Sequence, residues 1–413
     1  MTLTSSRPPV IFSHASRGEK PDSARLVLDS MLSHFNEEDV MKRISFVVLA
    51  LFIMLGSAHA AETVKIGLMA PMTGSWASEG AEMKQVCDLL AEQVNAKGGV
   101  AGKKIEVITE DDGGVPQTAA LAAQRLAALK VTVVIGTYGS AVTEASQNIF
   151  DEQKIIQIAN GSTAIRLTEK GLKYFLRTCP RDDEQAKVAA QTIRKLGVKK
   201  LAILHDNSTY AKGLADETKG LLAADKGVEI VFFDALTPKE QDYTTVLTKM
   251  KSFQPEMVFF TGYYGEAGLL LKQAKQMNWK VTFMGGDATN NPDLVKSAGK
   301  DASAGFYFLS APLPKDLPSE DAKAFLATFT KKYGNPPNSI YAVLAGDGLR
   351  VALEAIAKTN STDTEKVADY LHKNLKDFPG LTGKISFNDK GDRVGEVYRV
   401  YKVNEEGLFI LQP

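Results

Sequence analysis

Histidine and cysteine are scarce in this sequence, and their scarcity excludes several kinds of enzyme. Only two of the five histidines, His205 and His372, lie after residue 60, and they are far apart. The two cysteines, Cys87 and Cys179, are also widely separated, so no group of His and Cys residues has the spacing of a zinc site. We expect two separate buried thiols rather than a disulfide.

The motifs of common enzyme classes are absent as well. The sequence has no H-E-x-x-H, no G-x-S-x-G and no G-x-x-x-x-G-K-[ST], and no G-x-G-x-x-G follows the first predicted strand. No serine has a histidine that the sequence identifies as its base. We therefore expect a protein that performs no chemistry and uses no metal and no cofactor.

A surplus of charge of one sign is also absent. Lysine plus arginine number 49, as do aspartate plus glutamate, so the formal net charge is zero. This balance argues against nucleic acid or a membrane surface as a partner. The 413 residues, 44% of them hydrophobic, are enough for two globular domains. No run after residue 60 is long and apolar enough to be a transmembrane helix.

Residues 41–60, MKRISFVVLALFIMLGSAHA, have the pattern of a secretory signal. A basic start at Lys42 and Arg43 precedes an apolar run that is short for a membrane span, and the segment ends in an A-x-A cleavage site. We predict cleavage after Ala60 and a periplasmic location; an uncleaved anchor is the alternative. We also expect Met41 to be the true start, and residues 1–40 to be a non-native or disordered extension.

Beyond the signal, apolar segments alternate with helical patterns. The segments TVKIGLMA, KKIEVITEDD, VTVVIG, KIIQIA, KKLAILHD, GVEIVFFDAL, PEMVFFTG and KVTFMGG have the pattern of strands. Near-continuous apolar strands with helical crossovers predict parallel sheets that are covered on both faces. The C-terminal segment, ISFNDKGDRVGEVYRVYKVNEEGLFILQP, has the pattern of turns and short strands instead.

These units are too many for one sheet, and two breaks divide them. One break lies at YFLRTCPRDDEQA and the other at the proline-rich GFYFLSAPLPKDLPSED. We predict an α/β fold of two Rossmann-like lobes with parallel-rich central sheets, joined by three chain crossings and separated by a cleft. Lobe 1 would comprise residues 61–180 and 311–388, and lobe 2 residues 181–310 and 389–413.

Small and hydroxyl residues follow two strands of the first lobe. Tyr138 and Ser140 come after VTVVIG, and the run Gly161, Ser162 and Thr163 comes after KIIQIA. Ligands of open parallel sheets bind at the carboxyl ends of the strands, where helix N-termini also lie. Hydroxyl and backbone N–H groups in that position suit an anion. A plain helix N-cap is the alternative for Ser140.

The second lobe offers aromatic side chains and an acid at the corresponding places. Tyr210 follows KKLAILHD, Tyr263 follows PEMVFFTG, and Asp287 follows KVTFMGG. Packing against a neighbouring helix is the alternative for the tyrosines. Asp287 is not needed as a helix cap, because Asn290 and Asn291 stand closer to the next helix. A ligand with an anionic and a cationic end would fit between the lobes, and an α-amino acid is such a molecule.

Eight segments of the chain occur in the order and at the spacing of a known family. They are VKIGLMAPMTG, VNAKGGVAGKKIEVITEDD, VIGTYGSAVT, LRTCPRDDEQ, ILHDNSTYAKG, FFDALTPKEQDYTTVLTKMK, GYYGEAGLLLKQAKQ and FMGGD. On these segments, from about Val64 to Gly391, the sequence resembles the periplasmic leucine/isoleucine/valine-binding proteins, the type I solute receptors of ABC importers. The resemblance implies a two-lobed clamp that closes on its ligand.

The resemblance also implies roles for individual residues. Ser140 and Thr163 would hold the ligand carboxylate, helped by the backbone at Gly161, and Thr163 would also contact the ammonium group. Tyr210 and Tyr263 would close over the ligand from the second lobe. Asp287 would pair with the ammonium. The candidate ligand-binding residues are Trp76, Tyr138, Ser140, Gly161, Ser162, Thr163, Tyr210, Tyr263 and Asp287.

Three departures from the family pattern put the preferred ligand side chain in doubt. Gly114 and Gly139 stand where family members often bear a disulfide. Glu79 stands near the place of a family aromatic that packs on the ligand, and Trp76, three residues earlier, is the candidate substitute. At position 287 the usual acid is glutamate, so aspartate shortens the arm by one methylene.

The combined interpretation is an exported solute-binding protein of an ABC importer. It would bind an α-amino acid, of the branched-chain class, and deliver it to membrane permease subunits and their ATPases. A receptor of the same fold for an amide, urea or an aromatic carboxylate is the alternative. We expect a monomer.

Overall fold

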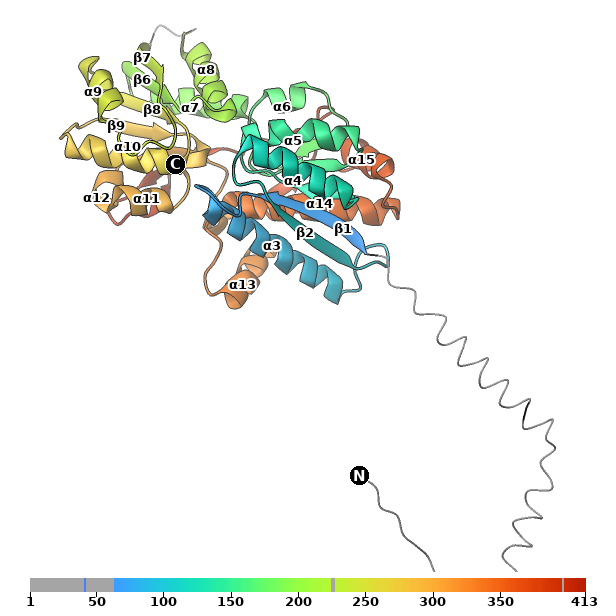
Figure 1. Cartoon of the computed structure of the whole chain (residues 1–413). Coiled ribbons are helices and arrows are strands. Elements are labelled where there is room, and N and C mark those ends of the chain that lie inside the picture. Colours follow the sequence, from blue (N-terminus) through green and yellow to red (C-terminus); the bar gives the residue numbers. More distant parts are fainter. Residues whose placement is uncertain (1–40, 42–62, 224–226, 396) are drawn as a thin grey trace, which may run out of the picture. The chain divides into compact units, whose positions relative to one another are not determined.

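The computed structural model of this chain describes residues 41, 63–223, 227–395 and 397–413 (Figure 1). The residues from Glu62 to Pro413 form one compact unit. Apart from Met41, the expected signal and the extension before it lie outside the described residues. Within the described ranges, no helix is both long and apolar enough to cross a membrane.

The sheet of the first lobe has five strands in the order β2-β1-β3-β4-β5, all of them parallel. The strands are β1 (Val64–Ala70), β2 (Ile105–Asp111), β3 (Val133–Ile135), β4 (Ile156–Ala159) and β5 (Phe175–Arg177), and the helices between them are α3 (Ala77–Ala96), α4 (Pro116–Ala128), α5 (Ser140–Glu152) and α6 (Arg166–Glu169). Strands β3 and β4 are buried at every position, because helices cover both faces of the sheet.

The sheet of the second lobe has seven strands in the order β14-β13-β10-β9-β8-β6-β7. Its elements are α7 (Asp182–Lys195), β6 (Lys200–His205), α8 (Thr209–Ala223), β7 (Glu229–Ala235), α9 (Thr244–Ser252), β8 (Met257–Thr261), α10 (Tyr264–Gln276), β9 (Thr282–Gly285), η1 (Asp287–Thr289), α11 (Asp293–Ala298), α12 (Lys300–Ser303), β10 (Tyr307–Ser310), η2 (Pro314–Asp316), β13 (Arg399–Val403) and β14 (Phe409–Leu411). Five strands are parallel, and β13 and β14 extend the sheet antiparallel.

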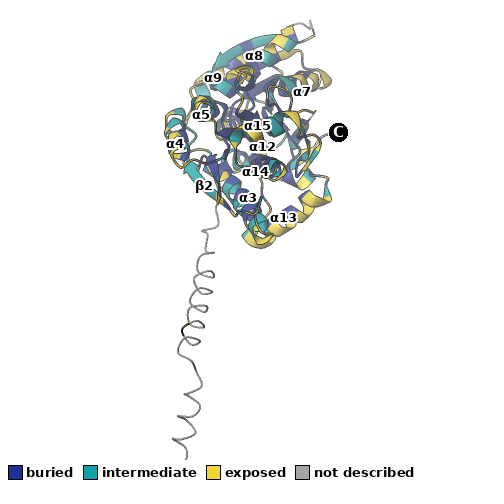
Figure 2. Cartoon of the chain, turned by 90° about the vertical axis from the view of Figure 1, so that its right-hand side faces the viewer, coloured by how far each residue is buried: buried dark blue, intermediate teal, exposed yellow. Residues whose placement is uncertain are grey.

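The chain returns to the first lobe between β10 and β13. This segment contains α13 (Glu320–Tyr333), α14 (Ile340–Thr359), α15 (Thr364–Lys373) and the hairpin of β11 (Phe378–Gly380) and β12 (Gly383–Ile385). Helix α14 packs on α3 and on strands β3 and β4, so it is a core helix, whereas α13 lies at the edge and carries many exposed residues (Figure 2). Gly346 allows the close approach, since a methyl group there would lie 2.7 Å from Val86.

The predicted fold class is confirmed: two α/β lobes, each with a parallel-rich sheet, form the unit. The chain passes between the two sheets after β5, after β10 and before β13. The C-terminal segment forms short strands, as its sequence pattern predicts. The lobe boundaries at residues 180, 310 and 388 stay predictions, although each falls in a segment where the chain leaves one sheet for the other.

Candidate functional site

The two sheets share a strand order that places a crevice at the same point of each lobe. In both, the first strand in sequence lies between the second and the third: β2-β1-β3-β4-β5 in one lobe and β7-β6-β8-β9-β10 in the other. Loops on either side of the first strand diverge at the carboxyl edge of such a sheet, and ligands bind there. The predicted site residues follow β1, β3 and β4 in the first lobe and β6, β8 and β9 in the second.

In the first lobe, Ser140 and Thr163 lie on adjacent loops. Ser140 is buried, and its Oγ accepts a hydrogen bond from the backbone N–H of Ala164 at 3.2 Å. The alternative of a plain N-cap is wrong for Ser140, because Gly139 is the N-cap and no side chain caps α5. The hydroxyl of Thr163 is buried and has no hydrogen-bond partner among the described residues. This loop pair therefore presents a free hydroxyl and the start of a helix.

A buried arginine holds the loop that carries Thr163. Arg177 Nη1 donates to the backbone oxygens of Ser162 at 3.0 Å and of Ala164 at 2.9 Å, on either side of Thr163. Arg177 Nε donates to Asp392 Oδ1 at 2.7 Å, and both side chains are almost fully buried. The carbonyl groups that flank Thr163 are thus fixed by a single guanidinium group.

Gly161 and Ser162, the two small residues before Thr163, do not present a free side-chain group to the crevice as Thr163 does. The hydroxyl of Ser162 points into the lobe, where it lies 2.6 Å from Thr143 Oγ1 and donates to the backbone oxygen of Thr137 at 3.0 Å. Only its backbone is left to face a ligand. A methyl group at Gly161 would lie 2.9 Å from Tyr138, so glycine allows this loop to pack against the aromatic ring.

Asp287 is a buried acid surrounded by neutral donors. Its Oδ2 accepts a hydrogen bond from the hydroxyl of Tyr398 at 3.1 Å, and its backbone N–H donates to Gln185 Oε1 at 2.8 Å. Burial raises the pKa of Asp287, while hydrogen bonding from Tyr210, Gln185, Tyr398 and Tyr341 opposes that rise. Among the described residues, no lysine or arginine forms an ion pair with it. Such a carboxylate suits a cation that comes from outside the chain.

The prediction that Asp287 does not cap the following helix is confirmed. The first turn, η1, begins at Asp287 with Gly286 as N-cap and has no side-chain cap. Asn291 Oδ1 instead accepts a hydrogen bond from the N–H of Asp293, the first residue of α11, at 2.8 Å.

Five aromatic rings from both lobes meet beside these polar groups. Tyr263 of the second lobe lies 4.2 Å from Trp76, 5.9 Å from Tyr138 and 5.5 Å from Tyr210, measured between ring centroids. Tyr138 in turn makes an edge contact with Tyr341 of α14 at 5.0 Å. These rings pack on one another across the lobes, and the hydroxyl of Tyr138 is buried without a hydrogen-bond partner among the described residues.

Trp76 lies on a floor made by two glycines. A methyl group at Gly114 would lie 2.6 Å from Trp76 Cε3, and one at Gly139 would lie 2.8 Å from Trp76 Cζ3. Any larger residue at either position would push the indole out of its place. A cysteine at either position, as the resemblance implies for a disulfide, would therefore be incompatible with Trp76 in this place.

Glu79 connects the two lobes instead of replacing the family aromatic. Its Oε1 accepts a hydrogen bond from Asn291 Nδ2 of the second lobe at 2.6 Å, and its Oε2 accepts one from the hydroxyl of Ser339, the N-cap of α14. Burial raises its pKa to about 7. Beside it, the hydroxyl of Tyr264 donates to the backbone oxygen of Ser75 at 2.8 Å.

A second set of contacts joins the lobes at another edge. Thr209 Oγ1 donates to Glu144 Oε2 at 3.1 Å and accepts from Arg166 Nη2 at 2.8 Å. Glu144 and Arg166 belong to the first lobe and Thr209 begins α8 of the second. The two lobes therefore touch through polar groups at two edges, with the aromatic rings between them.

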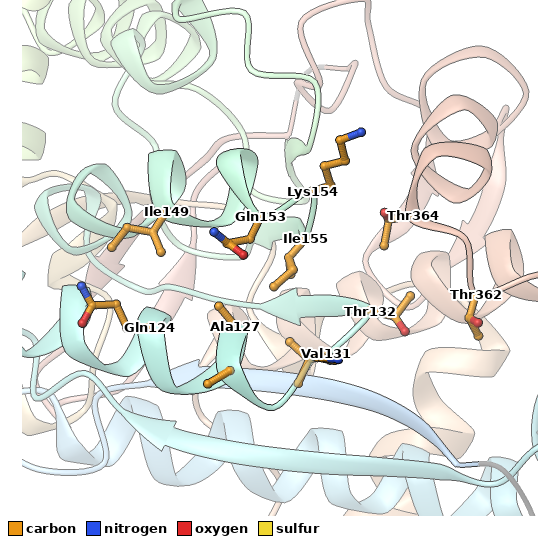
Figure 3. A pocket seen from close by; sticks show the side chains of 12 residues that line it. Gln124, Ala127, Val131, Thr132, Ile149, Gln153, Lys154, Ile155, Thr362 and Thr364 are labelled. Atoms are coloured by element: carbon orange, nitrogen blue, oxygen red, sulfur yellow. The ribbon is translucent and has the colours of Figure 1, made fainter.

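One surface hollow, of about 700 Å³, lies away from this crevice. It is lined by residues from α4, α5 and the start of α15, together with Val131, Thr132 and Ile155 (Figure 3). These residues precede β3 and β4, at the edge of the sheet opposite to the carboxyl ends. In the described part of the chain, no three His, Cys, Asp or Glu residues are grouped as metal ligands. Cys87 and Cys179 are separate buried thiols, as expected.

Sequence reasoning missed several residues of the crevice. Tyr341 and Tyr398 come from the returning segment and from the loop before β13, which carry no strand-end signal. Gln185 and Asp182 begin a helix, and Asp182 lies in the quoted segment LRTCPRDDEQ without having been assigned a role. Asn291 was considered only as a cap.

Two doubly wound lobes that enclose a buried acid between them define a receptor for a small solute. Residues 63–407 match the family model described as periplasmic binding protein. The Leu/Ile/Val-binding protein BraC3 of Rhizobium johnstonii is 33% identical over 364 residues, which are 88% of this chain and 97% of that protein.

Solved structures of similar proteins support the same family assignment. The structure of the leucine-binding protein LivK of Thermotoga maritima is 28% identical with a TM-score of 0.79, and covers 85% of this chain and 98% of its own. The structure of LivJ, a branched-chain amino acid transporter substrate-binding protein of Streptococcus pneumoniae in complex with isoleucine, is 30% identical with a TM-score of 0.78, and covers 85% and 99%. The chain belongs to the periplasmic binding protein family, a family of binding proteins rather than enzymes, and the resemblance seen in the sequence is confirmed.

Proposed function

We propose that this protein is exported and captures a free α-amino acid, of the branched-chain class, for an ABC importer. The observation that carries the proposal is Asp287, a buried carboxylate that accepts from neutral donors and is bound to no cation of the described ranges. An ammonium group would provide the missing charge. The relatives whose names mention leucine, isoleucine and valine support the choice of ligand class.

Each end of an amino acid would meet matching chemistry. The hydroxyls of Ser140 and Thr163 and the N–H groups at the start of α5 would bind the carboxylate, because a helix N-terminus favours an anion. Asp287 would bind the ammonium. Tyr210 and Tyr263 would cover the ligand from the second lobe, and Trp76 and Tyr138 would contact its side chain.

Capture would proceed by closing the lobes. The interlobe contacts of Glu79 with Asn291 and of Glu144 with Thr209 belong to the closed arrangement and would be lost when the lobes separate. A ligand that contacts both lobes stabilises the closed form, and membrane permease subunits would recognise that form. The ligand would be released chemically unchanged. Neither histidine of the described residues is placed as the base of a nucleophile: His205 accepts a hydrogen bond from the N–H of Asn207 at 3.1 Å, and Nε2 of His372 lies 3.0 Å from the backbone oxygen of Lys173.

A thermal-shift screen followed by calorimetry tests the proposal. The panel contains leucine, isoleucine and valine, together with amides, urea and benzoate. A ligand at 100 times its Kd adds about 2.7 kcal/mol to the free energy of unfolding. We expect stabilisation by the branched-chain amino acids. Stabilisation by an amide, urea or benzoate alone would contradict the proposal and favour the other receptor type.

Export and assembly state have direct tests. Mass spectrometry of the protein recovered from the periplasm should give a chain that begins at Ala61. A chain that keeps residues 41–60 would contradict cleavage. Light scattering on that protein should give the mass of a monomer, and twice that mass would show this expectation to be wrong.

A further inference from the structure

A second buried acid, Asp182, lies beside the candidate ammonium site. It is the first residue of α7, directly after the chain crosses from the first lobe to the second, and its side chain is fully buried. Its backbone N–H donates to the backbone oxygen of Thr163 at 3.0 Å. The acid therefore starts next to the hydroxyl that has no hydrogen-bond partner among the described residues.

One oxygen of Asp182 is available for a ligand. Its Oδ1 accepts a hydrogen bond from Gln185 Nε2 at 3.1 Å, whereas Oδ2 is buried and has no hydrogen-bond partner among the described residues. The hydroxyl of Thr163 lies close enough to lower the pKa of Asp182, but the two groups do not have the geometry of a hydrogen bond. Two polar atoms, from different lobes, are thus buried side by side and unpaired.

Gln185 and Tyr398 connect Asp182 to Asp287. The amide nitrogen of Gln185 also donates to the hydroxyl of Tyr398 at 3.0 Å, and that hydroxyl donates to Asp287 Oδ2 at 3.1 Å. The amide oxygen of Gln185 accepts from the N–H of Asp287 at 2.8 Å. One glutamine therefore contacts both acids and holds them on the same side of the crevice.

No cation of the chain neutralises this pair among the described residues. Arg177 attracts Asp182 electrostatically. Its guanidinium group, however, donates its hydrogen bonds to Asp392, to the Ser162–Ala164 loop and to Thr168. A buried carboxylate that is neither paired nor neutralised costs several kcal/mol, so two of them require a positive charge or a proton.

We propose that Asp182 is a second acceptor for the ligand's ammonium group, which would lie between Asp182 and Asp287 beside the Thr163 hydroxyl. This inference rests on the proposed function. A primary ammonium group has three N–H donors, and these three side chains offer one acceptor each. The site would therefore select a primary amine over a ligand of the same shape that carries a hydroxyl in its place.

The pair of buried acids, Asp182 and Asp287, would couple ligand binding to the release of a proton. Burial, followed by the charge of Asp287, raises the pKa of Asp182 well above its usual range, and burial also raises that of Asp287. The other groups facing the pair are Arg177, Asp183, Gln185, Thr163, the thiol of Cys179 and the hydroxyls of Tyr138, Tyr210, Tyr263, Tyr341 and Tyr398. In the free protein the two buried carboxylates would share a proton, because like charges that lie close together oppose each other's ionisation. An arriving ammonium would displace it, so one ligand binds and one proton leaves to solvent.

The first experiment compares two probes on the unaltered protein. L-leucine and L-2-hydroxyisocaproate share a carboxylate and a side chain, but only leucine carries an ammonium. Calorimetry at about pH 5.5 and about pH 7.5 leaves the charges of both probes unchanged. We expect leucine affinity to fall as pH falls, by up to about tenfold per unit, because protons compete for the pair. Hydroxyisocaproate affinity should stay equal or rise.

The second experiment uses Asp182→Asn, with Asp183→Asn as the matched control next to it in the sequence. Asp182→Asn should weaken leucine binding by about 10- to 100-fold, leave hydroxyisocaproate binding equal or stronger, and reduce the pH trend. Asp183 is ion-paired with Arg181 at 3.1 Å and is the last of the charges that act on Asp182, so its replacement should keep the difference between the two probes and the direction of the pH trend.

Several results would overturn the inference. Equal loss of both probes in Asp182→Asn would indicate a structural role, and unchanged leucine binding would indicate no role. If the variant does not fold, parallel pH trends of the two probes on the unaltered protein would refute the inference without it. If the unaltered protein binds no amino acid at all, the proposed function fails and this inference with it.

Discussion

Replacing Glu79 by glutamine should make this protein less sensitive to pH. Glu79 is buried and accepts hydrogen bonds from Asn291 and Ser339, which are neutral, and no positive charge in the described part of the chain compensates its burial. Burial raises its pKa from 4.5 to about 7. A carboxyl with a raised pKa favours the protonated form in the folded state. The contribution of Glu79 to the free energy of unfolding is therefore largest below about pH 4.5, falls as the pH rises to about 7, and changes no further above that.

The size of the pKa shift of Glu79 sets how far its charge lowers the free energy of unfolding. A rise of about 2.5 in pKa corresponds to about 3.4 kcal/mol, at about 1.4 kcal/mol for each unit. Glu79→Gln keeps the shape and carries no charge; its amide oxygen can still accept from Asn291, and its NH2 group can donate to the hydroxyl of Ser339. We expect the variant to equal the unaltered protein at about pH 4.5 and to exceed its free energy of unfolding by up to about 3 kcal/mol at about pH 8.5.

Urea unfolding at a series of pH values measures this difference. Asp112 and Asp206 also have raised pKa values, of about 7 and about 6, so the unaltered protein should lose stability over the same range for more than one reason. The difference between the two proteins isolates Glu79. Glu106→Gln, at an exposed position of β2, is the control and should show no such difference. A pH-independent difference, or a variant that is less stable at high pH, would refute the reasoning.

Three further predictions concern the crevice and the thiols. Asp287→Asn should weaken leucine binding by about 2–4 kcal/mol, the cost of removing one member of a buried charge pair, and unchanged affinity by calorimetry would exclude Asp287 as the ammonium partner. Gly139→Ala should displace the indole of Trp76, change its fluorescence and weaken binding, whereas Gly265→Ala, which meets open space, should do neither. The two cysteines should not react with a thiol reagent in the folded protein, since burial raises the pKa of each thiol to about 12; rapid reaction without denaturant would show that they are accessible.

The sheets and half of the crevice are predictable from the sequence for a physical reason. Strands that are buried on both faces are continuous apolar runs, and the residues after them must lie at the carboxyl edge of a parallel sheet. Ser140, Thr163 and Asp287 follow such strands, so their neighbourhood is visible in a single sequence. The closeness of the two lobes, which brings them to one crevice, follows from family resemblance.

The other half of the crevice depends on contacts between residues that are distant in sequence. Glu79 accepts hydrogen bonds from Asn291 and Ser339, which lie 212 and 260 positions later in the sequence. No local pattern marks either of them as a partner of Glu79. Tyr398 reaches Asp287 from 111 positions away. Of these partners only Ser339 lies in the returning segment, whose packing on the first lobe a single sequence records only as an apolar helix. The pairs of Asn291 and Tyr398 depend on where the second lobe places the segment after β9 and the loop before β13.

The arginine that flanks Thr163 has a consequence for how this protein could change its ligand in evolution. Arg177 holds the Ser162–Ala164 loop and, through Asp392, a segment where the chain crosses back between the lobes. Substitutions that reshape this loop would also disturb the crossing on which lobe closure depends. Trp76 and its glycine floor have no such attachment to a crossing segment. New specificities should therefore arise around Trp76, while the Thr163 loop, which we propose binds the carboxylate and the ammonium of the ligand, is retained.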